Sequence, residues 1–258
     1  MTEAVPEIAL TAEEVDEILA QCGSHALLVG GQALALWSAI YEVTPPEILA
    51  TSISSDADFI GSADIAAKLG RALKNWRFWK PKPDDATVQT AKLTLTTAGG
   101  IKQIDFLGAI AGLKTEAVQR RAVTLTLASG TDLRVLHPLD VLESRLQNLL
   151  LIPAKRHAGG IAQAHLAIGI AKSFLIHIIE EKSGRRLLFD AIERIVQIAT
   201  NKRLTGVMLD YHIDVCAAIP IEQIEHVTFR TKRWPKILQT VQEQKRRYLQ
   251  QQTNRSVK

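Results

Sequence analysis

The sequence predicts an α+β fold in two domains: a mixed or antiparallel sheet flanked by helices in residues 1–137, and a helical bundle in residues 138–258. Three observations lead to this expectation. Helical and strand-like patterns alternate as far as Leu136, two pairs of strands have the form of hairpins, and only long helical patterns follow His137-Pro138. A chain of 258 residues is long enough for two modest domains that each bury a core.

The expected elements of the first domain are, in chain order, a helix over residues 12–22, a strand over 25–29, a helix over 32–41, a loop and strand over 51–60, a helix over 63–75, a hairpin of strands 88–97 and 101–110, and a hairpin of strands 123–127 and 133–136. Thr11-Ala-Glu-Glu14 has the form of a capping box for the first helix, and Gly23 ends that helix. The first strand is a short apolar run that leads into the Gly30-Gly31 turn. Thr44-Pro-Pro46 stops the second helix.

Caps and turns support the later elements of this domain. Either Ser62 or Asp64 caps the third helix. Pro81 to Asp85 is a loop. Gly99-Gly100 makes a tight turn between two stretches of alternating apolar and polar residues. Ser129 to Asp132 joins the second hairpin, which is a candidate to close the sheet.

The second domain is expected to contain helices over residues 139–151, 161–182, 185–200, 204–217 and 233–250. Between Thr228 and Lys258, nine Lys or Arg residues stand against one acidic residue, Glu243. We interpret this basic tail as a solvated helix face, with contact to nucleic acid as the alternative.

The composition is typical of an ordinary folded protein, with 47% hydrophobic and 22% charged residues. The first twenty residues contain no lysine or arginine, unlike a secretory leader, and we find no uninterrupted apolar run of about 18 residues that would span a membrane. We therefore expect a cytoplasmic protein without a membrane partner. Cys22 and Cys216 have no Cys or His at zinc-ligand spacing, so we expect free thiols.

Two aspartates introduce the candidate site. Because side chains alternate along a strand, Asp56 and Asp58 should share one face while Ala57 and Phe59 point to the buried face. Their Cβ atoms would lie about 6.6 Å apart, close enough for the oxygens to share divalent cations. The two carboxylates repel each other, and a cation relieves that repulsion. Oxygen ligands favour Mg²⁺, which is usually shared with substrate phosphates.

Asp105 is the expected third ligand, because its neighbours Ile104 and Phe106 should face the core and leave the carboxylate on the site face. Aspartate is disfavoured in strands, so three acids on two predicted strands need an explanation beyond packing. Gly30-Gly31 lies between a buried strand and a helix, where backbone N–H groups can approach a phosphate, although an isolated Gly-Gly pair is more often only a turn.

These motifs resemble those of the DNA polymerase beta-like nucleotidyltransferase superfamily, and most closely its bacterial branch of abortive-infection toxin-like proteins, the AbiEii group. The resemblance covers about residues 25–110, and the order of the short motifs carries most of its specificity. The matching segments are Val29-Gly-Gly-Gln-Ala-Leu34, Ser55-Asp-Ala-Asp-Phe59 and Ile104-Asp-Phe106, with a looser match over the helix from Pro138 to Leu146.

The resemblance implies that residues 1–137 are a nucleotidyltransferase-like domain with Asp56, Asp58 and Asp105 as catalytic, metal-binding residues. It implies two metal ions, with Mg²⁺ as the expected ion and Mn²⁺ as an alternative. It also implies that Gly30 and Gly31 hold an NTP and that Asp105 helps to activate the acceptor hydroxyl. RNA, particularly tRNA, or a protein would be the acceptor, and a toxin or phage-defence protein with an antitoxin-like partner is the implied setting.

Five further residues are weighed for contacts to substrate. Ser55 adjoins the acidic pair and could bind nucleotide, although serine before a strand is also ordinary loop chemistry. Arg145, Lys155 and Arg156 are candidate phosphate or acceptor contacts, although a solvated helix end explains the charges near 155 equally well. Arg145 stands where the related proteins often carry a lysine. Lys92 is expected to be a surface lysine on a half-exposed strand, with contact to a phosphate as the alternative.

The sequence thus predicts an Mg²⁺-dependent nucleotidyltransferase that moves a nucleoside monophosphate from an NTP to an acceptor hydroxyl of RNA or protein. The alternative is a catalytically silent module of the same kind that binds nucleotide, RNA or a partner protein. The presence of all three acids favours the enzyme. A metal-dependent phosphohydrolase is the least favoured hypothesis.

Overall fold

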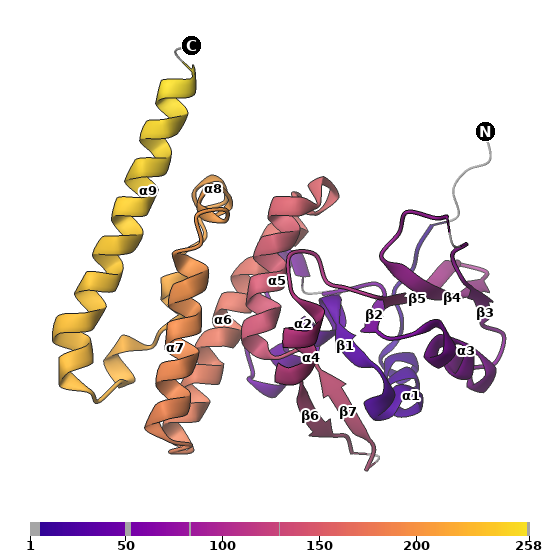
Figure 1. Ribbon diagram of the computed structural model, residues 1–258. Helices are drawn as coiled ribbons and strands as arrows, with labels where there is room; N and C mark the ends of the chain where they lie inside the picture. The colour runs from indigo at the N-terminus through magenta and orange to yellow at the C-terminus, as the bar shows by residue number, and fades with distance from the viewer. Residues whose placement is uncertain (1–5, 50–52, 83, 129, 257–258) are drawn as a thin grey trace. The chain divides into compact units, whose positions relative to one another are not determined.

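The computed structural model describes residues 6–49, 53–82, 84–128 and 130–256 (Figure 1). The chain divides into two compact units: the first consists of Met1–Ala39 and Pro45–Val141, and the second of Ile40–Thr44 and Leu142–Lys258. The division falls inside helix α5 (Pro138–Leu151), whereas the sequence pattern placed it near residue 137. Four residues of the expected loops lie outside the described residues, namely Thr51, Ser52, Pro83 and Ser129.

Among the described residues, seven strands form one mixed sheet in the first unit, in the order β3-β4-β5-β2-β1-β7-β6. The strands are β1 (Leu27–Val29), β2 (Ala57–Ile60), β3 (Arg77–Trp79), β4 (Gln89–Thr97), β5 (Gly100–Leu107), β6 (Val123–Thr126) and β7 (Asp132–Val135). Both expected hairpins are confirmed as the antiparallel pairs β4–β5 and β6–β7. Because β2 is parallel to β5 and antiparallel to β1, the fold is α+β with a mixed sheet. The sheet stays open, with β3 and β6 at its edges.

The helices of the first unit begin largely where the sequence places them. They are α1 (Ala12–Cys22), α2 (Gly30–Ile40), α3 (Ala63–Ala72) and α4 (Thr115–Arg121). The capping box is confirmed, since the Thr11 hydroxyl accepts from the Glu14 N–H and the Glu14 carboxylate accepts from the Thr11 N–H. Of the two expected caps for α3, Ser62 is the one used. Helix α2 begins at Gly30 itself, two residues before the expected start.

Three local expectations for the first unit are corrected by the structure. The first strand begins at Leu27, because Gly23–His25 form a 3₁₀ turn. The edge strand β3 was not expected, since its three residues are all exposed and show no alternation of burial. Helix α4 was also not expected. It has seven residues and lacks a side-chain cap at its start, so its sequence signal is weak.

At β2, β4 and β5, the apolar core of the first unit lies on one face of the sheet. The residues of these strands that are not part of this core lie on the opposite face. Phe59 of β2 and Phe106 of β5 are fully buried and stack with ring centroids 5.5 Å apart. Leu93 of β4 is also fully buried and lies against α3 near Gly70. Since successive side chains alternate, the residues between these apolar positions point to the opposite face of the sheet.

The second unit is helical, as expected. Besides most of α5, it contains α6 (Ala158–Glu180), α7 (Arg185–Ala199), α8 (Thr205–Asp210) and α9 (Trp234–Ser256). The expectation of one helix over residues 204–217 is wrong. Helix α8 ends at Asp210, His212 has a positive φ of 53°, and a separate 3₁₀ turn follows at Val215–Ala218.

Among the described residues, helix α6 is long and apolar enough to be a candidate membrane span. The search of the sequence for an unbroken apolar run did not find it, because polar residues interrupt the helix. Its 18-residue window has a mean hydropathy of 1.4, and 44% of that window is buried inside the structure. The helix packs against α7 within the second unit (Figure 1). A core helix of a folded unit passes the same test, so the pattern is weak support for a membrane span.

An ion pair between a buried carboxylate and a partly exposed guanidinium joins α4 to the start of α5 in the first unit. Asp140 is fully buried and accepts from Nε and Nη2 of Arg121 at 3.0 and 2.6 Å. Removing one partner of a buried pair leaves a poorly compensated charge. We expect Arg121→Met to lower the free energy of unfolding by about 3 kcal/mol in urea denaturation. The exposed neighbour Arg120, changed to Met, should alter it by less than about 0.5 kcal/mol; equal effects would contradict the assignment.

Candidate active site

The three aspartates expected from the sequence come together in the first unit. Among the described residues, one ligand atom from each of Asp56, Asp58 and Asp105 lies within 4.8 Å of the others. Asp58 in β2 and Asp105 in β5 are register partners on adjacent parallel strands. Asp56 lies in the bend just before β2, two residues before Asp58. Each of the three carboxylates is half-buried.

Strand alternation explains why these acids share a face. Ala57 and Phe59 are buried on one side of β2, and Asp58 between them is half-buried on the other. In β5, Ile104 and Phe106 are fully buried and Asp105 lies between them. A shift of one residue in either strand would send its acid into the core, so the apolar pattern fixes the site.

Two side chains of β4 contact Asp105. Gln89 Nε2 donates to Asp105 Oδ1 at 3.0 Å, and Lys92 Nζ lies 3.4 Å from the same oxygen. Lys92 Nζ also donates to Gln103 Oε1 at 2.8 Å. The expectation of a simple surface lysine is therefore corrected: Lys92 is the register partner of Asp105 across the hairpin. Counting strand pairs outward from the Gly99-Gly100 turn would have found this contact.

The environment of Asp105 shifts the pKa of its carboxyl upward. Burial raises the pKa of this carboxyl above its ordinary value, and the charge of Asp56 raises it further, while the Lys92 ammonium lowers it. Glu7 adds a smaller upward contribution to the same pKa. Two like charges about 4 Å apart near a protein surface repel by about 4 kcal/mol. A divalent cation among the three carboxylates would offset both the repulsion between them and the cost of keeping Asp105 charged while it is partly buried.

The two serines before Asp56 have different partners, and the contact of Ser55 to a nucleotide stays a prediction. Ser54 Oγ donates to Asp56 Oδ1 at 2.8 Å. Ser55, which the sequence favoured because it adjoins Asp56, instead donates to Glu7 Oε1 at 3.1 Å. The path of the loop before β2 decides between them, and that path has no periodic sequence signal.

The Gly30-Gly31 pair is packed against this site. Gly30 has a φ of 65°, and a Cβ atom on it would lie 2.8 Å from Asp58 Cβ and would overlap the Asp58 carboxylate. A Cβ on Gly31 would overlap the side chain of Ser54. Both positions therefore require glycine for close approach, and Gly30 also for its backbone conformation. As the first residues of α2, they bring helix N–H groups beside the acids.

The donor set suits a hard divalent cation. All three potential ligand atoms are carboxylate oxygens, and the described residues of the cluster include no sulfur or imidazole ligand. Such a set fits Mg²⁺ or Mn²⁺ better than zinc. Asp56, Asp58 and Asp105 could hold the ion, and the start of α2 adds a positive dipole end and backbone N–H donors for an anion that shares it.

Arg145 is buried in the second unit. Its Nη1 donates to Gln163 Oε1 at 3.0 Å, and its Nε lies 3.4 Å from Ser144 Oγ. A guanidinium keeps its positive charge when it is buried. It belongs to a different unit from the three acids, and its contact to a phosphate remains a prediction.

Arg156 and Lys155 also belong to the second unit. Arg156 Nε and Nη2 donate to the carbonyl oxygens of Leu149 and Leu150 at 2.8 and 2.7 Å. These contacts satisfy carbonyl groups at the end of α5, as a helix C-terminus requires. Lys155 ends a short 3₁₀ turn (Pro153–Lys155) and is exposed.

Together, the acids and the glycine turn place three carboxylates beside the N-terminus of a helix. No protein-family model matches the sequence, and no curated protein matches it either. The chemistry proposed below rests on the geometry of the site and on the motif resemblance.

We expect Gly30→Ala to destabilise the protein more than Gly130→Ala. Gly130 has a φ of 79° and nothing within 4 Å of a built Cβ, so it reports only the cost of the left-handed conformation, about 1–2 kcal/mol. Gly30→Ala adds the overlap with Asp58 to that cost. Urea denaturation of both variants measures the difference, and equal losses of unfolding free energy would show that Asp58 does not pack against this turn.

We expect Asp105→Asn to stabilise the cation-free protein slightly at neutral pH. Because the pKa of Asp105 is raised in the fold, this group contributes stability below its ordinary pKa and loses it as the pH rises through the raised pKa. The neutral amide should also abolish stabilisation by Mg²⁺, which for the wild type is about 2.7 kcal/mol at a hundred times Kd. Urea denaturation with and without MgCl₂ tests both effects, and an equal Mg²⁺ effect in both proteins would contradict the site.

Proposed function

We propose that the protein is an Mg²⁺-dependent nucleotidyltransferase that transfers a nucleoside monophosphate from an NTP to an acceptor hydroxyl and releases pyrophosphate. The observation that carries this proposal is the convergence of Asp56, Asp58 and Asp105 beside the start of α2. Triphosphate transfer needs such a pairing, because the carboxylates hold the cation while backbone N–H groups contact the phosphates. The motif resemblance to the DNA polymerase beta-like superfamily supports the same reaction.

Each residue of the site has its own role in the proposed reaction. Asp56 and Asp58 would hold Mg²⁺, which when bound neutralises charge on the triphosphate. Gly30 and Gly31 allow the phosphates to approach the N–H groups at the start of α2, because no side chain stands between them. Asp105 accepts the proton of the acceptor hydroxyl, and its raised pKa suits a general base better than an ordinary aspartate.

Gln89 and Lys92 position that base. Both contact Asp105 Oδ1, which leaves Asp105 Oδ2 as the oxygen that can turn to a cation or to an acceptor. The Lys92 ammonium also limits the charge of the acid cluster before a cation enters. An RNA, particularly a tRNA, or a protein side chain is the proposed acceptor, and a cytoplasmic toxin or defence protein with an antitoxin-like partner is the proposed setting.

We expect the wild-type protein to transfer label from an α-³²P-labelled NTP to total tRNA or to protein in the presence of Mg²⁺. Asp56→Asn and Asp58→Asn should reduce labelling by at least about 10²-fold, since each removes a ligand of the cation. Asp105→Asn should reduce it by about 10²–10⁴-fold through loss of the base. Gel electrophoresis and the mass of the product identify the acceptor and the added nucleotide.

Asp64→Asn is the matched control, because Asp64 is an exposed acid at the start of α3 outside the cluster. It should retain labelling within about twofold, as surface substitutions usually do. Labelling that survives in the Asp56, Asp58 and Asp105 variants would contradict the proposal. Nucleotide binding by calorimetry without any transfer would instead support a silent binding module, and release of phosphate without a labelled acceptor would support a phosphohydrolase.

A further inference from the structure

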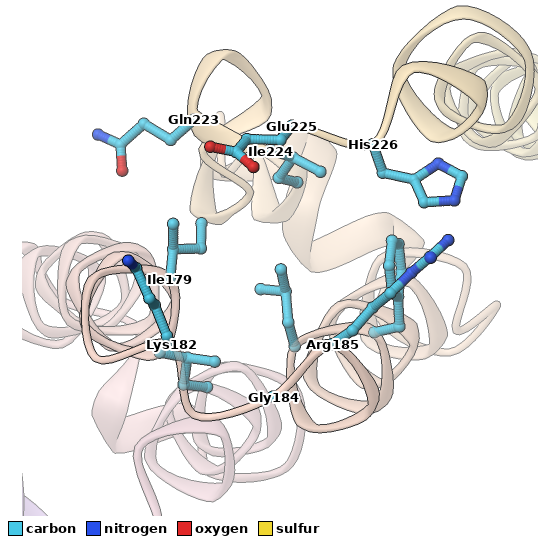
Figure 2. Close-up of a pocket in the computed structure, with 11 residues that line it drawn as sticks. Ile179, Lys182, Gly184, Arg185, Gln223, Ile224, Glu225 and His226 are labelled. Carbon is cyan, nitrogen blue, oxygen red and sulfur yellow. The ribbon is translucent and has the colours of Figure 1, made fainter.

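Two adjoining cavities lie in the second unit, and they share the lining residues Arg185, Phe189 and His226. The larger has a volume of about 480 Å³ and the smaller about 180 Å³. Figure 2 shows Arg185 and His226 at one end of the larger cavity and Lys182 at the other. Because they share a wall, the two spaces form one bipartite groove, which we call the α6–α7 groove.

The larger chamber of the α6–α7 groove is mostly apolar. Ile178 and Ile179 come from the end of α6, Leu188 from α7, and Ile224 from the segment that precedes the π-helical turn Phe229–Arg233. Figure 2 shows Ile179 and Ile224 on opposing walls of this space. A chamber with aliphatic walls favours an apolar ligand group, which gains free energy by leaving water.

The smaller chamber carries basic side chains between aromatic rings. Its described lining residues are Arg185, Phe189, His226, Thr228, Phe229 and Arg233, none of which is acidic. Arg185 is held over the Phe189 ring, with its Cζ 5.7 Å from the ring centroid, and Phe189 meets the His226 ring edge-on at 5.5 Å. The aromatic contacts therefore preorganise a guanidinium at the junction of the two chambers.

His226 adds a hydrogen-bond donor to this chamber. Its Nδ1 accepts from the Phe229 N–H at 3.0 Å, so in the neutral ring the proton is on Nε2. Neither Arg185 nor Arg233 forms an ion pair within the described part of the chain, where the adjacent Arg186 does pair with Asp190 at 3.7 Å. Two guanidinium groups, a hydroxyl and an imidazole N–H thus surround a space without a carboxylate.

We propose that the α6–α7 groove binds a small amphipathic anion, with its phosphate or carboxylate head in the chamber of Arg185 and Arg233 and its aliphatic part against Leu188 and Ile224. Charge complementarity selects the head, since guanidinium groups bind both anions through paired N–H donors. The larger chamber is also lined by Lys182 and Glu225, whose opposite charges give that chamber no net preference for an anionic group. The proposal is independent of nucleotidyl transfer by the acid cluster.

The binding test uses the full-length protein and four probes in isothermal titration calorimetry: octyl phosphate, octanoate, 1-octanol and inorganic phosphate. Octyl phosphate, octanoate or both should bind saturably, and octanol and inorganic phosphate should bind at least about tenfold more weakly, because each lacks one half of the ligand. The two anionic arms identify the head group. No saturable binding of either amphipathic anion at millimolar concentration, or equal binding of octanol, would overturn the proposal.

Two variants locate the binding site. Arg185→Gln/Arg233→Gln should weaken binding of the amphipathic anion by about tenfold or more, because charge-assisted hydrogen bonds to the head are lost. Arg186→Gln is the matched control, since Arg186 is exposed and is not among the lining residues of either chamber. Equal weakening by the control would overturn the assignment.

A third variant tests the apolar chamber. Leu188→Asn should weaken octyl phosphate while leaving the weak binding of inorganic phosphate unchanged. Thermal denaturation of each variant shows whether it is folded. If Leu188→Asn unfolds the protein, Ile179→Asn gives the same comparison from α6. Unchanged binding of octyl phosphate in a folded variant would contradict the placement of the aliphatic group.

Discussion

The parallel pairing of β2 with β5 is the constraint on which the candidate site depends. It sets Asp58 opposite Asp105, while the antiparallel pairing of β2 with β1 sets Val29 opposite Asp58. The chain leaves β1 at Gly30, so the glycine turn meets Asp58 directly. Three backbone segments thus converge through hydrogen-bonded register, and Phe59 and Phe106 hold that register by filling the core behind the acids.

Bringing the three carboxylates together lowers the stability of the protein when no cation is bound. Three half-buried carboxylates repel one another, and burial adds to the cost of keeping Asp105 charged. Lys92 and Gln89 relieve part of it from the neighbouring strand. Folded proteins accept such unfavourable arrangements mainly at functional sites, where a ligand returns the lost free energy. The arrangement therefore has a simple explanation if a divalent cation with bound phosphate is the natural occupant.

The sequence predicts the acids but not their immediate partners. Alternation around Asp58 and Asp105 is a local property, as are the capping box at Thr11 and the two hairpins, and all of these agree with the structure. The contact of Lys92 follows only when the hairpin register is counted from the Gly99-Gly100 turn. The contact of Ser54 depends on the path of a loop, which has no periodic signal. The expected helix over residues 204–217 ran through the break after α8, although Asp210, His212 and Asp214 interrupt its apolar pattern and His212 has a positive φ.

The α6–α7 groove was also beyond sequence reasoning, because it joins the end of α6 to residues more than thirty positions later in the chain.

The most direct measurement of cation binding by the three acids is the anomalous scattering of a crystal soaked with Mn²⁺ and a non-hydrolysable NTP analogue. The account predicts an anomalous peak bounded by Asp56, Asp58 and Asp105, with nucleotide phosphate between that peak and Gly30-Gly31. Nucleotide bound with no anomalous peak at the three acids, or a peak without nucleotide at the glycine turn, would contradict it.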